Sequence, residues 1–211
     1  MTSILFIWCK VNSDLGYKQG MNDLLGLFVF VAYCDLPQED LSSLTPKNSE
    51  ILKKLINKFD LEADLYWCFD KLMERGIRDL FTPVVTKQML NRKKNDLFTW
   101  ESEKDHNDLV NVDKSKELNV SPILRRSHII HHQMLRTLEP ALYKYLEKVK
   151  IEPQMYLQRW LRCMLSREFS LHDCLIIWDA LLASSDDESG LELLDYMCVA
   201  MLKFVESFSK V

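Results

Sequence analysis

The sequence predicts an all-α fold, and three observations support this prediction. Glycine and proline are scarce, with five and six among 211 residues. Apolar residues mostly recur at intervals of three and four, the spacing of one helix face. The composition, 47% hydrophobic and 27% charged, is ordinary for a globular chain long enough to bury a core. We therefore expect one domain built from helices.

The N-terminal part is predicted to form four helices. They cover residues 3–11, 18–31, 48–59 and 60–76. Turn and proline chemistry separates the first three, at residues 12–16 and at Asp35-Leu36-Pro37. The fourth begins with acidic residues, as helix N-termini favour, and is expected to stop at Gly76. Its expected apolar face consists of Leu61, Leu65, Phe69 and Leu72, broadened by Trp67 and Cys68.

Residues 86–119 differ from the rest of the chain. Lysine, asparagine, aspartate and glutamate are dense there, and leucine or valine is isolated. Such a segment buries too little apolar surface to offset its conformational entropy. We expect a long, flexible surface insertion.

Five helical stretches are predicted after this insertion. They cover residues 121–138, 140–150, 153–167, 171–182 and 190–208. Ser121-Pro122 opens the first with N-cap and first-turn proline chemistry, and Ser170 with Asp173 resembles a capping box before the fourth. The third is the most regular, with an apolar face of Met155, Leu157, Trp160, Leu161, Met164 and Leu165.

Composition and motifs argue against several classes of protein. The net charge is −4 and the basic residues are scattered, so nucleic acid is not an expected partner. The longest apolar run, residues 24–33, is about half of a membrane span. No GxxxxGK[ST], GxGxxG or GxSxG motif occurs. Six widely spaced cysteines without a secretory leader favour buried, reduced thiols in a cytoplasmic protein.

Three histidines, His128, His131 and His132, lie on one predicted helix, where a pair three or four residues apart could bind a metal. No acidic residue accompanies them in an HExxH arrangement. We therefore interpret them as surface or packing residues, and predict neither a metal site nor a bound cofactor. The acidic runs at residues 39–40 and 186–188 are interpreted as solvated loops.

The segment 16–25, GYKQGMNDLL, is the most unusual part of the sequence. Two glycines flank an aromatic residue and an amide before a hydrophobic helix, which would hold Gln19 at an exposed helix N-terminus. Spacing alone leaves an ordinary loop-to-helix junction as the more economical interpretation.

Two further sequence motifs favour a functional interpretation of this segment. Residues 61–69, LEADLYWCF, and residues 160–171, WLRCMLSREFSL, followed by Ile177-Trp178-Asp179, occur in that order after Tyr17-Lys18-Gln19-Gly20-Met21. Together they resemble the YxQGM, E-x-x-x-[YF]-W-[CA]-F, W-x-x-x-x-L-x-R-E-F-x-L and [IV]-W-D motifs of TBC-domain Rab GTPase-activating proteins. Residues 17–35, 151–156 and 194–202 are most similar to the branch containing TBC domain family member 5.

The resemblance implies a right-handed array of stacked helices whose shallow groove receives the switch regions of a GTP-bound Rab GTPase with its Mg²⁺. Gln19 corresponds to the glutamine that the family donates to GTP hydrolysis, so the protein would be a GTPase activator rather than an enzyme. Tyr17, Gly20, Met21 and Asn22 are expected to contact the GTPase. Location in the cytoplasm, with peripheral recruitment to endosomal or other trafficking membranes, fits this role.

The family's second catalytic group, an arginine from an IxxDxxR segment upstream of YxQG, has no counterpart here. The first arginine in the chain is Arg75. We expect that the N-terminal segment of the domain is missing; a catalytically impaired Rab-binding adaptor, or a helical scaffold without a GTPase partner, is the alternative. Arg162 and Arg167 are expected to form structural ion pairs with Glu168 or Asp179, and Trp67, Trp160 and Trp178 to anchor the core.

Overall fold

The computed structural model describes residues 1–35, 45–55, 59–83, 121–184 and 192–209. Within these ranges all regular structure is helical, so the predicted all-α class is confirmed. The predicted insertion at residues 86–119 lies outside the described residues. Its interpretation, like that of the chain as one domain, stays a prediction.

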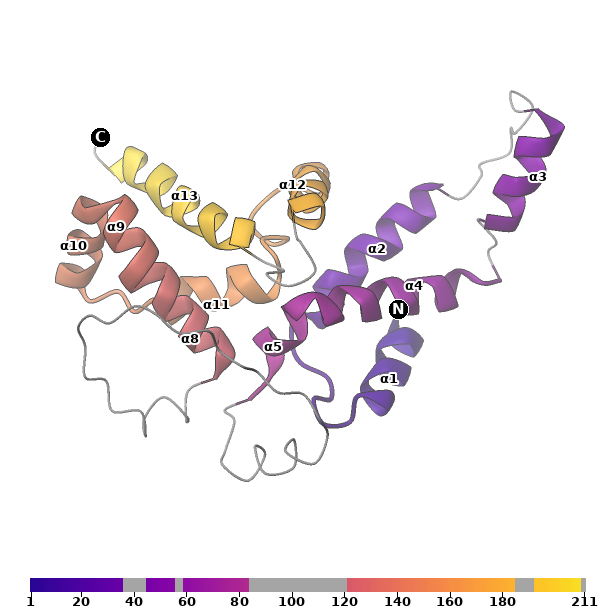
Figure 1. The fold of residues 1–211 in the computed structure, drawn as a ribbon, viewed down its shortest axis with the longest axis horizontal. Coiled ribbons are helices and arrows are strands. Elements are labelled where there is room, and N and C mark those ends of the chain that lie inside the picture. Colours follow the sequence, from indigo (N-terminus) through magenta and orange to yellow (C-terminus); the bar gives the residue numbers. More distant parts are fainter. Residues whose placement is uncertain (36–44, 56–58, 84–120, 185–191, 210–211) are drawn as a thin grey trace, which may run out of the picture.

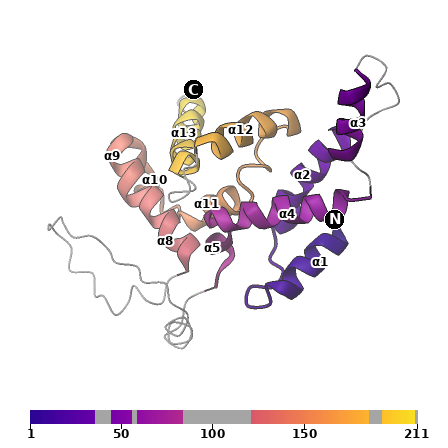
Figure 2. The ribbon, with the colours of Figure 1, turned by 45° about the vertical axis from the view of Figure 1, so that its right-hand side comes forward.

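The helices follow one another in chain order. They are α1 (Thr2–Val11), α2 (Met21–Asp35), α3 (Pro46–Leu55), α4 (Leu61–Leu72), the π-helical η2 (Met73–Ile77), α5 (Arg78–Phe81), α8 (Pro122–Ile129), the π-helical η3 (Ile130–Leu135), α9 (Arg136–Leu138), α10 (Pro140–Val149), α11 (Gln154–Arg162), α12 (Leu171–Ser184) and α13 (Glu192–Ser209). Figure 1 shows α1, α2 and α4 on one side and α8, α9, α10 and α13 on the other, with α5 and α11 between them. In Figures 1 and 2, α3 lies at the outer edge.

Helix α1 is fixed to α4 by a buried tryptophan. Trp8 is fully buried, and its ring meets Phe69 edge-on at 5.3 Å between centroids. Its indole Nε1 donates a hydrogen bond to the Asp70 carboxylate at 2.8 Å. A buried indole N–H requires such a partner, so this contact sets the register between the two helices.

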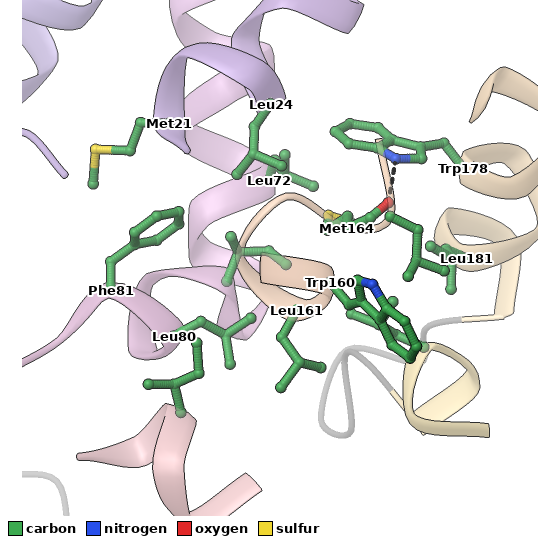
Figure 3. Close-up of a cluster of buried hydrophobic side chains, with 14 of the residues drawn as sticks. Met21, Leu24, Leu72, Leu80, Phe81, Trp160, Leu161, Met164, Trp178 and Leu181 are labelled. Atoms are coloured by element: carbon green, nitrogen blue, oxygen red, sulfur yellow. Dashed lines mark hydrogen bonds between the residues drawn. The ribbon is translucent and has the colours of Figure 1, made fainter. Parts of the chain in front are cut away.

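The core continues where α2, α5, α11 and α12 meet (Figure 3). The buried side chains there are Met21 and Leu24 of α2, Leu80 and Phe81 of α5, Trp160 and Leu161 of α11, and Trp178 and Leu181 of α12. This core joins α2 and α5 to α11 and α12, so that α2 and α12, more than 130 residues apart in the sequence, contribute to one cluster.

The turn after α11 has an uncommon backbone. Met164 and Leu165 have φ of 45° and 63°, which places two non-glycine residues in the left-handed region. The N–H of Leu165 donates to the Trp160 carbonyl at 2.9 Å and that of Met164 to Leu161 at 3.2 Å, the pattern of a Schellman C-cap. Both side chains are 1% exposed, so burial offsets the backbone strain.

Several predicted boundaries change in the structure. Helix α2 begins at Met21 rather than at residue 18, because Gly20 has a φ of 107° that no helix accommodates. Helix α11 ends at Arg162, before the left-handed turn and not at residue 167. Helix α4 ends at Leu72 and continues as η2, in which Gly76, with a φ of 87°, breaks the helical conformation at the predicted position, and the short helix α5 follows.

Four side chains expected in the core are exposed instead. Trp67 is 60% exposed and Met155 is 75% exposed. Cys34 and Cys68 are exposed as well, although all six cysteines are free thiols, as predicted. Trp67 lies two positions from buried Leu65, about 200° around the helix, so it faces away from the core. None of the described helices has the length and apolar character that crossing a membrane requires.

Candidate functional site

An open cleft of about 310 Å³ lies where the loop before α2 meets α11 and the turn after it. Its lining residues are Gln19, Gly20, Gln154, Met155, Gln158, Arg159, Arg162, Cys163 and Arg167. The side chain of Gln19 is exposed, so its amide is accessible from solvent at this cleft. Three guanidinium groups and no carboxylate are among the lining residues, and the cleft therefore suits an anionic or hydrogen-bonding ligand.

The loop of residues 17–20 presents Gln19. It follows Gly16, which has a φ of 62°, and ends at Gly20. The Gly20 carbonyl accepts hydrogen bonds from the N–H groups of Asp23 and Leu24 at 3.1 and 3.2 Å, so Gly20 is the N-cap of α2. Gln19 consequently stands one residue outside the helix, not on its first turn as the sequence suggested.

Gly20 is also the point where the loop rests on the rest of the fold. A Cβ at this position would lie 3.5 Å from the Phe81 ring, 3.6 Å from Cys163 Sγ and 3.7 Å from Arg162 Cβ. These are ordinary contact distances, so crowding does not exclude a side chain there. The backbone conformation does, because a φ of 107° is strained for any L-residue with a side chain.

Replacing Gly20 with alanine is expected to lower the free energy of unfolding by roughly 1–3 kcal/mol, since the variant must adopt the strained φ or displace the loop. Urea denaturation followed by circular dichroism measures the change. Gly26 offers a matched control, because it lies inside α2 with nothing within 4 Å of the position of its Cβ. Gly26→Ala is expected to raise stability by about 0.5–1 kcal/mol. Equal effects of the two changes would contradict the role assigned to Gly20.

Two of the three cleft arginines form ion pairs with carboxylates. Arg167 Nη2 lies 2.9 Å from Asp23 Oδ2, which ties the turn after α11 to the first turn of α2. Arg159 Nε and Nη2 lie 2.7 and 2.9 Å from the two oxygens of Glu168. The predicted structural role of Arg167 is supported, but its predicted partners were wrong: Asp23 replaces Glu168 and Asp179.

Arg162 differs from the other two. Its Nε donates to the Leu80 carbonyl at 3.3 Å, and no carboxylate of the described chain is paired with it. The predicted ion pair of Arg162 is therefore wrong. The half-buried guanidinium therefore contributes to the cleft a positive charge that no described carboxylate pairs with, and the carbonyl that orients it lies 82 residues earlier in the chain.

Cys163 closes the inner end of the cleft. It is 4% exposed, and burial, with the nearby Asp23 carboxylate, raises the pKa of its thiol above the ordinary value. A thiol in such surroundings stays protonated and is a poor nucleophile. The cleft therefore offers amides and guanidinium groups rather than covalent chemistry.

The other residues expected to contact a GTPase are divided by burial. Tyr17 is 54% exposed, and its hydroxyl donates to Asn22 Oδ1 at 3.0 Å across the loop. Met21 is fully buried, and its sulfur accepts the N–H of Lys18 at 3.3 Å. A direct contact of Met21 with a partner is thus inconsistent with the structure, and its role is to anchor the loop.

The residues of the W-x-x-x-x-L-x-R-E-F-x-L and [IV]-W-D motifs differ in burial. Trp160 and Trp178 are 8% and 4% exposed, as expected of core anchors. The Trp178 Nε1 donates to the Met164 carbonyl at 3.0 Å (Figure 3). Asp179 is exposed on α12 and does not line the cleft. Ser170 and Asp173 form the predicted cap, with the Asp173 N–H donating to Ser170 Oγ at 3.3 Å.

A further set of contacts fixes the chain just before the loop. Arg78 of α5 contacts both carboxylate oxygens of Asp14 at 2.7 and 2.8 Å. Its guanidinium also hydrogen-bonds Asn12 and lies 5.7 Å from the Trp8 ring centroid. The hydrogen bond from Arg78 lowers the pKa of Asp14, so the contact persists at neutral pH.

Sequence reasoning did not find Gln154, Gln158 and Arg159 as cleft residues. A signal was present, since residues 154, 158 and 162 recur at intervals of four and share one face of α11. Polar residues at this spacing are, however, equally typical of the solvent-facing side of an amphipathic helix. Only the position of the loop before α2 shows that this side borders a cleft.

Comparison with known proteins gives two kinds of result. Residues 1–111 and 106–208 match the model of the Rab-GTPase-TBC domain. The chain is 32% identical over 209 residues to human TBC1 domain family member 5, covering 97% of this chain and 24% of that protein. The resemblance to the branch containing that protein is thereby confirmed.

Other relatives agree. Human TBC1 domain family member 13 is 30% identical over 96% of this chain and 37% of its own length. The GTPase-activating protein gyp1 of Schizosaccharomyces pombe is 28% identical over 94% of this chain and 31% of its own length. The chain thus spans roughly a quarter to two fifths of these curated relatives, which all match it along nearly its whole length.

Proposed function

Because this chain belongs to the Rab-GTPase-TBC domain family, we propose that it activates GTP hydrolysis by a Rab-family GTPase, with Gln19 as the catalytic residue. The proposal rests chiefly on one observation: Gln19 is exposed at a polar cleft between two segments that carry the family's motifs. The partner would be the GTP-bound form with its Mg²⁺. The relative named for GTPase activation, gyp1, supports the proposed activity.

The chemistry of an amide suits the task. GTP hydrolysis is limited by the placement of the attacking water and by charge that develops on the transferred phosphoryl oxygens. The Gln19 carbonyl oxygen can accept a hydrogen bond from that water while its NH₂ donates to an oxygen of the partner. An amide does both without adding a negative charge beside the phosphates, which a carboxylate would do.

The cleft has features that support binding of the partner around this residue. Tyr17 and Met155 are 54% and 75% exposed and provide apolar contact surface near the amide. Arg162 adds a positive charge at the same cleft. Such a mixture of aromatic, methionine and arginine side chains is typical of protein interfaces. Asn22 acts indirectly, by holding Tyr17.

Catalysis also needs a positively charged group beside Gln19, and we expect it to come from outside this cleft. No arginine precedes Gln19 in the sequence, Arg159 and Arg167 of the cleft are engaged by Glu168 and Asp23, and Arg162 is held through its Nε by the Leu80 carbonyl. An arginine inserted in trans is worth roughly 10³- to 10⁵-fold in rate. We therefore expect full activation only when a segment preceding residue 1 supplies the arginine that this family resemblance implies.

The test is GTP turnover by a panel of Rab GTPases, measured as phosphate release, with residues 1–211 and with an N-terminally extended protein. Strong stimulation of at least one Rab is expected from the extended form and much weaker stimulation from residues 1–211. Equal stimulation by the two forms would refute the assignment of the arginine. Binding of a GTP-loaded Rab by both forms without stimulation would establish the alternative, a non-catalytic adaptor in membrane trafficking.

A further inference from the structure

A second cluster of chemically active side chains lies on the α8–α10 side of the molecule. His131 and His132 belong to η3, and Glu147 belongs to α10. One potential ligand atom from each of the three residues lies within 4.8 Å of the others. None of them lines the Gln19 cleft. The cluster is therefore independent of the proposed function.

The two imidazoles are held in position by tyrosines. His131 Nδ1 lies 2.7 Å from the Tyr156 hydroxyl, and His132 Nδ1 lies 3.2 Å from the Tyr143 hydroxyl. His131 Nε2 faces Glu147 Oε1 at 3.1 Å. A histidine that ligates a metal commonly has its other ring nitrogen fixed in this way by a hydrogen-bonding partner.

The backbone contributes to the arrangement. Residues 130–135 form a π-helical turn between α8 and α9. Such turns are rare and frequently occur at functional sites, because they re-aim side chains that an α-helix would direct elsewhere. Here the turn contains both histidines, and its side chains meet α10, which follows the break at Glu139-Pro140.

We propose that His131, His132 and Glu147 bind a divalent transition-metal ion of the zinc type, with the fourth position left to water. Two imidazoles and one carboxylate are a donor set that zinc uses in sites with an open position. The 3.1 Å between His131 Nε2 and Glu147 Oε1 is close to the roughly 3.4 Å between neighbouring ligands of a tetrahedral zinc ion. A bound ion would draw the widest pair, within 4.8 Å in this structure, together by up to about 1.4 Å, and the half-exposed Glu147 has room to move.

The sequence alone argued against a metal here, since no acidic residue accompanies the histidines on their own helix. The fold supplies the carboxylate from 15 or 16 positions further along the chain. The competing interpretation is a hydrogen-bond network without an ion, in which Tyr156 and Glu147 satisfy the buried His131. Both interpretations use the same contacts, so a binding measurement has to decide between them.

The experiment is a Co²⁺ titration of residues 1–211 with all cysteines reduced, followed by visible absorption, with Zn²⁺ competition to obtain the affinity. One ion is expected per chain, with the ligand-field bands of a nitrogen and oxygen site and no thiolate charge-transfer band. His132→Ala and Glu147→Gln are expected to weaken binding by about 100-fold or more. His172→Ala, which removes an exposed histidine of α12, is expected to leave the affinity unchanged.

Three results would overturn the proposal: no stoichiometric binding, a thiolate band that places the ion at cysteines, or unchanged affinity in both cluster variants. Circular dichroism of the two variants checks that each remains folded. His131 itself is left intact because its full burial makes a folding defect the expected effect of replacing it. GTP turnover by a Rab partner is read out separately, so failure of either proposal is recognised without reference to the other.

Discussion

Replacing Gln19 with alanine is expected to lower the GTP hydrolysis rate of the Rab partner, at saturating extended protein, by about 100-fold or more. The variant removes the amide that would hold the attacking water and leaves the rest of the cleft in place. Gln19 is exposed and lies outside α2, so its truncation removes no core contact. Single-turnover phosphate release, combined with affinity for the GTP-loaded Rab, measures the effect.

Two measurements make this expectation decisive. Gln133→Ala removes an equivalent side chain that is exposed on η3 and does not line the cleft, so it should keep full activity. The Gln19→Ala variant should retain unchanged thermal stability and most of its affinity, because the lost interaction belongs mainly to the transition state. Full activity of Gln19→Ala would refute the catalytic assignment, and loss of binding alone would reduce Gln19 to a contact residue.

Local sequence patterns were sufficient for the class of fold and for most helices. The period of three and four places Leu65, Phe69 and Leu72 on the buried face of α4. Ser170 and Asp173 mark the start of α12 through chemistry that acts within one turn. These signals are reliable because the cause and the structural result lie within a few residues of each other.

The boundaries that failed depend on distant parts of the chain. The turn at Met164 and Leu165 contains no glycine, so the sequence does not indicate its left-handed conformation. Burial of the two side chains in the core stabilises that conformation. The Asp23 partner of Arg167 lies 144 residues away. Trp67 was assigned to the core by residue type, although its position on α4 points it outward. Tertiary packing decided the first two outcomes, whereas the outward position of Trp67 follows from the helical period alone.

The candidate site depends both on a local sequence motif and on contacts between distant parts of the chain. Gln19 was identified through the resemblance of its motif, whereas the cleft around it needs α11 and the following turn to lie against the loop. Gly20 illustrates the difference. Its identity suggested a tight turn, whereas the closeness of Phe81 and Cys163 to the position that its Cβ would take is a property of the folded chain.

The stability of this cleft depends on Trp178, and Trp178→Ala is expected to lower the free energy of unfolding by about 3–5 kcal/mol. Trp178 is 4% exposed and meets Phe28 of α2 edge-on at 5.8 Å between centroids. The substitution leaves a cavity between α2 and α12. It also leaves the Met164 carbonyl without its hydrogen-bond donor, in the turn that leads to Arg167.

Trp67→Ala is the matched control for this experiment, because it removes the same side chain from a position that is 60% exposed. Its expected effect is within about 0.5 kcal/mol. Trp178→Phe separates the two contributions, since it retains most of the apolar volume and loses only the donor, at a cost of about 1–3 kcal/mol. Urea denaturation of the three variants yields these differences. If Trp67→Ala and Trp178→Ala proved equally destabilising, the packing of α12 against α2 could not be what holds the turn and the cleft arginines in place.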